Sequence, residues 1–110
     1  MNWYVAKIIF RITTTSPQEV AQFEEHLHLI QATSFEKAFI KARLIGITEE
    51  DQFSSQKENA RQWEFVNIAE LNPLQELSDG LEVYSQIHET MEARSYINLI
   101  HQKAAALSEG

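Results

Sequence analysis

The stretch that most constrains the fold is the alternating segment WYVAKIIFRIT, residues 3–13. Successive side chains of a β-strand point to opposite faces of the sheet. As a strand, the segment has one fully apolar face and one mixed face. The apolar face holds Tyr4, Ala6, Ile8, Phe10 and Ile12, and the mixed face holds Trp3, Val5, Lys7, Ile9 and Arg11. The pattern therefore predicts a long strand of a sheet, with its apolar face in the core.

Three further strands are predicted from alternation elsewhere in the chain. They cover residues 23–32, 61–71 and 81–89. In the first of them Leu27 and Leu29 share a face, and we expect this pair to lie in the core. Asp79 and Gly80 predict a turn just before the last of the three strands.

Two main helices are predicted from apolar residues at helical spacing. The first begins after Thr33, which has the capping-box spacing with Glu36, and it ends at Gly46. A short helix over residues 47–53 would follow, with acidic side chains in its first turn. The second main helix covers about residues 92–107.

This order of elements, strand–strand–helix–strand–strand–helix, predicts an α+β fold. Because strands and helices do not alternate tightly, we expect a four-stranded, mainly antiparallel sheet with two main helices. The chain has 110 residues, a length that suits one domain. We therefore expect residues 1–110 to form a single α+β domain, which can bury roughly two thirds of its unfolded surface.

Composition and charge narrow the partners and the location. The formal net charge is −7, and the nine basic residues are dispersed along the chain, so we expect no nucleic-acid partner. There is no cysteine, which excludes disulfides and fits a reducing cytoplasm. Lys7 and Arg11 interrupt the apolar N-terminal stretch, which is too short for a signal peptide or a membrane helix. We expect a soluble, cytoplasmic protein with no membrane contact.

One group of side chains raises the question of a metal or ligand site. Glu24, His26 and His28 share one face of the strand predicted over residues 23–32. A zinc site needs three or four converging ligands, and the other two histidines, His88 and His101, lie far away in the sequence. The favoured interpretation is a solvated or interface face, with no metal and no cofactor. A metal- or ligand-binding site is the alternative.

Motifs of catalysis are absent from the sequence. There is no G-x-S-x-G nucleophile elbow, no P-loop and no H-E-x-x-H sequence. Carboxylate groups such as Glu49, Glu50 and Asp51 are typical of a helix start or a solvated surface. The sequence therefore assigns no catalytic residue.

Several strings, taken together, are similar to a known family. They are NWYVAKIIFRI, EEHLHLIQATSFEKAFIKARLIG, RQWEFVNIAELNPL and DGLEVYSQI, and they extend from Trp3 to about Ile87. They resemble the bacterial domain-of-unknown-function family numbered 4288. The resemblance implies a small bacterial α+β domain and carries no activity. It also implies that the paired histidines are particular to this chain, because residues such as Gln and Arg are more frequent in the family at the positions of His26 and His28.

The mixed face of the first strand gives the main functional hypothesis. Helices on one side of a sheet leave its other side bare, and an exposed apolar patch there usually marks an association surface. The candidate interface residues are Trp3, Val5, Lys7, Ile9 and Arg11. Alternatively, the C-terminal helix or the loop over residues 13–22 would cover them.

Three functional hypotheses follow. The first is a non-enzymatic binding or assembly module that forms a homodimer, and a protein partner also fits this hypothesis. The second is a small metal- or ligand-binding, enzyme-like site around Glu24, His26 and His28. The third is an accessory protein whose acidic surface neutralises a basic partner, as immunity-type proteins do.

Overall fold

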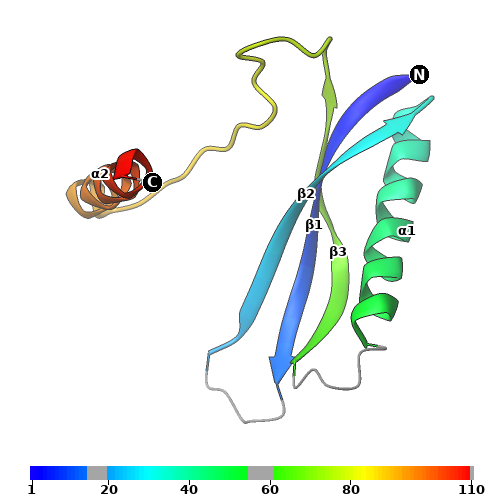
Figure 1. Cartoon of the computed structure of the whole chain (residues 1–110), viewed down its shortest axis with the longest axis horizontal. Coiled ribbons are helices and arrows are strands. Elements are labelled where there is room, and N and C mark those ends of the chain that lie inside the picture. Colours follow the sequence, from blue (N-terminus) through cyan, green and yellow to red (C-terminus); the bar gives the residue numbers. More distant parts are fainter. Residues whose placement is uncertain (15–19, 55–60, 110) are drawn as a thin grey trace.

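The computed structural model of the chain describes residues 1–14, 20–54 and 61–109. In chain order its elements are β1 (Asn2–Thr14), β2 (Gln22–Ala32), α1 (Phe35–Ser54), β3 (Arg61–Leu74) and α2 (Ala93–Glu109). The strands form an antiparallel sheet of order β2-β1-β3, and α1 packs on it. α2 stands apart at the end of an extended segment (Figure 1). The α+β class is confirmed, with three strands in the described residues.

The apolar face of β1 forms the centre of the core, as its alternation predicts. Tyr4, Ala6, Ile8 and Phe10 are buried, and the last three have no exposed surface. Because β1 is the central strand, both of its edges are hydrogen-bonded to neighbours. α1 covers this face with the small side chains of its buried side. We call this the helix face of the sheet, and the opposite side the open face.

The prediction that Leu27 and Leu29 form the core pair of β2 is wrong. Ile30 pairs with Tyr4 across the sheet and is buried. Paired residues share a face, so the period of two places His28 and His26 on the helix face as well. Leu27 and Leu29 lie on the open face, where they are 52% and 56% exposed.

α1 is a single helix that continues through Gly46, although the sequence pattern predicts a helix end at this residue. A Cβ at this position would lie 2.5 Å from the Phe65 ring and 3.2 Å from Cγ2 of Ile8. The glycine therefore allows α1 to approach the sheet closely, and it does not end the helix. The N-cap is also shifted by one residue, because the Lys37 N–H donates to Oγ of Ser34 at 3.2 Å.

The pairing of β3 with β1 is irregular at two points. The register to β1 shifts between Lys7 and Ile8 and again between Ile9 and Phe10. Such bulges change which side chains share a face. Residues of β3 that pack against the core are Trp63, Phe65, Ile68 and Leu71. The strict alternation expected for this strand, which separated Ile68 from Trp63 and Phe65, is therefore broken.

The strand predicted over residues 81–89 is not a strand in the structure. Asp79 and Gly80 form the predicted turn, with Gly80 at φ 84°, and an extended segment follows. Side chains rather than a backbone ladder tie this segment to the sheet: Tyr84 accepts a hydrogen bond from Lys7. Within the described residues, α2 packs against no other helix or strand.

Candidate functional site

Two histidines and a carboxylate meet where β2 and α1 face each other. His26 and His28 project from β2, and Glu49 projects from α1, one turn beyond Gly46. Nδ1 of His26 lies 3.4 Å from Oε2 of Glu49, and Nε2 of His28 lies 3.3 Å from Oε1. One possible ligand atom from each residue falls within 4.8 Å of the other two. We call His26, His28 and Glu49 the His–Glu cluster.

A second carboxylate orients one of these rings. Nε2 of His26 lies 2.7 Å from Oε1 of Glu24, a hydrogen-bond distance. With Nε2–H donating to Glu24, the neutral ring presents the lone pair of Nδ1 towards Glu49. Oε2 of Glu49 is buried and has no hydrogen-bond partner among the described residues. In this tautomer, two hydrogen-bond acceptors, Nδ1 of His26 and Oε2 of Glu49, face each other across 3.4 Å.

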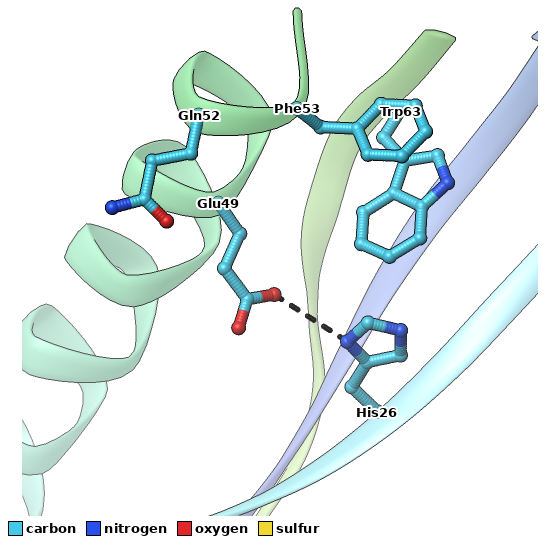
Figure 2. A pocket seen from close by; sticks show the side chains of 5 residues that line it. All are labelled: His26, Glu49, Gln52, Phe53 and Trp63. Carbon is cyan, nitrogen blue, oxygen red and sulfur yellow. Dashed lines mark ion pairs between the residues drawn. The ribbon is translucent and has the colours of Figure 1, made fainter. Parts of the chain in front are cut away.

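An aromatic wall stands beside the His–Glu cluster. Phe53 and Trp63 stack with ring centroids 4.4 Å apart, and the His26 ring meets Trp63 at 5.2 Å in an edge-on arrangement. A cavity of about 300 Å³ lies here, lined by His26, Glu49, Gln52, Phe53 and Trp63. Figure 2 shows the Glu49 carboxylate pointing at His26, with the aromatic pair above. A small ligand in this cavity would contact polar side chains on one side and aromatic rings on the other.

The structure brings together Glu24, His26 and His28, as their shared face predicts, but it adds a residue that sequence reasoning missed. The sequence pattern predicts a helix end at Gly46 and places Glu49 among solvated charges at the start of a second, short helix. One signal points to it: Ala38, Ala42, Ile45 and Glu49 follow one another at spacings of four, three and four, a single helical face.

The remaining histidines do not join the cluster. His88 stacks on Tyr96 with ring centroids 4.6 Å apart. His101 is an exposed residue of α2, which packs against none of the other elements in the described part of the chain. The His–Glu cluster therefore draws its side chains from β2 and α1 alone.

The open face of the sheet is the second candidate site. Phe23, Leu27 and Leu29 of β2 are all more than half exposed there, and Arg11 and Trp3 of β1 are exposed beside them. Ile9 is half-buried on the same face. The apolar groups of this surface are interrupted by two exposed charges, Glu25 between Phe23 and Leu27 on β2 and Arg11 on β1.

The middle of the predicted interface is covered by the chain itself. Val5 and Lys7 are only 5% and 7% exposed. The ring of Tyr84 lies 4.2 Å from Nζ of Lys7, and its hydroxyl accepts a hydrogen bond from the same ammonium. Of the five interface candidates, Trp3, Ile9 and Arg11 keep accessible surface, while Val5 and Lys7 do not.

Lys7 is the central charge of the open face. Its Nζ lies 3.0 Å from Glu70 and 3.9 Å from Glu25. The hydrogen bond to Tyr84 and the neighbouring Glu70 raise the pKa of Lys7 to about 12. In turn, the Lys7 ammonium holds the pKa of Glu70 below its ordinary value. The segment around Tyr84 is therefore fixed to the sheet by a charged group that stays ionised at neutral pH.

The comparison with protein families shows which family the chain belongs to. The model of the domain of unknown function DUF4288 matches residues 3–85. The chain belongs to this family. No curated protein and no solved structure matches the chain. The DUF4288 match includes all three strands, α1 and Tyr84, so it contains both the His–Glu cluster and the open face, and it stops before α2.

DUF4288 is described as a domain of unknown function, so membership brings no activity or ligand to this chain. Neither helix in the described residues is long and apolar enough to cross a membrane. The open face and the His–Glu cluster are the two features of the structure that bear on function.

Proposed function

We propose that the protein is a non-enzymatic binding and assembly module that forms a homodimer through the open face of its sheet. The observation that carries the proposal is the apolar surface of β2, where Phe23, Leu27 and Leu29 are 56%, 52% and 56% exposed. Exposed apolar groups that adjoin one another usually mark an interaction surface. The proposal includes the cytoplasmic location and bacterial origin expected from the sequence.

The energetics favour a second copy as the cover. Burying a large apolar side chain fully is worth about 1.5–3 kcal/mol relative to leaving it in water. A two-fold contact uses the same patch on both copies and so gains this term twice. Trp3 and Arg11 lie beside the patch on β1, and aromatic and arginine side chains are enriched in interfaces.

The free helix supports the same proposal. Four apolar side chains of α2, Tyr96, Ile97, Leu99 and Ile100, are each 38–52% exposed, and the helix packs on no other helix or strand of the described chain. The described chain thus contains an apolar sheet face and an apolar helix side, and large parts of both stay exposed. In the dimer, α2 of one copy would lie against the open face of the other.

The direct test is the mass in solution, measured by light scattering after size exclusion at micromolar concentration. We expect a dimer for the parent chain and a monomer for Leu29→Glu, because a charge on the open face must then be desolvated in the contact.

The matched control is Leu44→Glu on α1. Leu44 is 58% exposed, much like Leu29, but it lies in the layer on the other side of the sheet. We expect it to leave the dimer intact. A monomeric parent, or dimer loss only in Leu44→Glu, would refute the open face as the contact.

A further inference from the structure

We propose that His26, His28 and Glu49 bind a divalent transition-metal ion, and that Glu24 holds His26 in position for it. This inference is independent of self-association, because the His–Glu cluster lies on the helix face of the sheet. Three features of the cluster support this site: the spacing of its donor atoms, the two facing acceptor atoms that a cation would bridge, and the types of its donors.

The spacing matches the edges of a metal coordination shell. Zinc bonds of about 2.0–2.1 Å in a tetrahedron place neighbouring donor atoms about 3.3 Å apart. The two measured separations to the carboxylate of Glu49 are 3.4 Å from His26 and 3.3 Å from His28. Both are longer than an ordinary N–H···O hydrogen bond of about 2.7–3.2 Å. The two separations end on different oxygens of Glu49, and one donor atom from each residue lies within 4.8 Å of the other two. One ion can therefore reach all three side chains after a small inward shift of the donor atoms.

The electrostatics call for a positive charge between the groups. When His26 donates Nε2–H to Glu24, its Nδ1 is an acceptor that faces another acceptor, the buried Oε2 of Glu49. A cation at this point satisfies both atoms at once. The Glu24–His26 pair is then the carboxylate–histidine arrangement that commonly orients a metal-binding ring and raises its basicity.

The donor types select the class of ion. Two imidazoles and one carboxylate suit zinc, iron(II), nickel or copper, whereas calcium and magnesium prefer oxygen donors alone. Three protein ligands leave at least one coordination position for water or a small ligand. The cavity lined by His26, Glu49 and the Phe53–Trp63 pair adjoins the site, so that position has space beside it.

A proton in place of the ion is the competing arrangement. His26 protonated on both nitrogens would be an imidazolium between Glu24 and Glu49, with no role for a metal. The two arrangements differ in whether a metal binds stoichiometrically, and in which residues that binding needs.

The test uses the full chain without a histidine tag, stripped of metal by a chelator. Cobalt(II) is added and followed by its visible absorption, and zinc(II) is added in a calorimeter. We expect one equivalent of each to bind, with the intense visible bands of a low-coordinate cobalt site. Zinc should also raise the thermal midpoint, because it joins β2 to α1 in the folded state only.

The variants separate ligands from the positioning residue. His28→Gln and Glu49→Gln remove a ligand and should abolish the cobalt bands. Glu24→Gln should keep bands of the same shape but weaken binding by about 10–100-fold. His101→Gln on α2 is the matched control and should bind like the parent. Circular dichroism of each variant checks that it is folded.

Two results would overturn the inference. One is the absence of saturable cobalt or zinc binding by the folded parent. The other is binding that survives in a folded His26→Gln, His28→Gln double variant, since the ion would then lie elsewhere. Either result would leave the His–Glu cluster without a metal, and neither would bear on the dimer, which is tested by mass.

Discussion

Replacing Gly46 by alanine tests the contact that sets how α1 lies on the sheet. The added Cβ would fall 2.5 Å from Cδ1 and Cε1 of Phe65. Carbon atoms pack at about 3.5–4.0 Å, so the ring or the helix must move by roughly 1 Å. The Phe65 ring has little freedom, because its backbone N–H donates to Glu50 at 2.5 Å and its ring contacts Phe10.

Two opposing terms set the magnitude. Alanine is more favourable than glycine in a helix interior by about 0.8–1.0 kcal/mol. Overpacking of a core contact costs about 1–3 kcal/mol. Because the clash falls on a ring tied to both layers, we expect Gly46→Ala to lower the free energy of unfolding by about 1–2 kcal/mol in net. In a domain of 60–100 residues, each kcal/mol lowers the melting temperature by roughly 4–8 °C.

The assay is urea denaturation followed by circular dichroism, for the parent, Gly46→Ala, Phe65→Ala and the double variant at one protein concentration. Without the Phe65 ring only the 3.2 Å contact with Cγ2 of Ile8 remains. Gly46→Ala in that background should therefore lower the free energy of unfolding much less than in the parent, or raise it by up to about 0.8–1.0 kcal/mol. A gain in stability on adding Gly46→Ala to the parent, or an equal loss in both backgrounds, would refute the close-approach argument.

Two further predictions concern the core and the charge on the open face. Ile8→Ala should lower the free energy of unfolding by about 2–5 kcal/mol, since Ile8 is fully buried; an unchanged urea midpoint would contradict the assignment of the helix face. Because Lys7 lowers the pKa of Glu70, the ionised carboxylate stabilises the fold above about pH 4.5, and this contribution is lost as pH falls through the lowered pKa. The stability difference between the parent and Glu70→Gln should therefore shrink on acidification, and a difference independent of pH would count against the ion pair.

The family and most elements follow from local sequence. Alternation along β1 is enough to predict which of its faces is buried, because a strand with one fully apolar side has only one stable way to face a core. The turn at Gly80 and the last helix also follow from local residues. The DUF4288 match covers residues 3–85, nearly the same stretch as the sequence resemblance from Trp3 to about Ile87.

The candidate site is predicted only in part. The shared face of Glu24, His26 and His28 follows from the period of two in any strand. Glu49 does not, because its place depends on α1 continuing past Gly46. A glycine near the end of a helical pattern usually marks a helix end, and only the nearness of the Phe65 ring shows its other use.

Local sequence by itself determined that the first segment is a strand, which of its faces is buried, and the class of fold, since these depend on the order of apolar and polar residues along the chain. Tertiary structure alone decided which face of β2 is buried. The sequence of β2 offers two leucines on one side and two histidines on the other, and hydrophobicity favours the leucines. Pairing with β1 places Ile30 in the core, and the strand period then turns the histidines towards α1 and the leucines outwards. The side of the sheet on which a strand residue lies depends on its partner in the neighbouring strand. That partner is distant in the sequence, so local hydrophobicity does not predict the pairing.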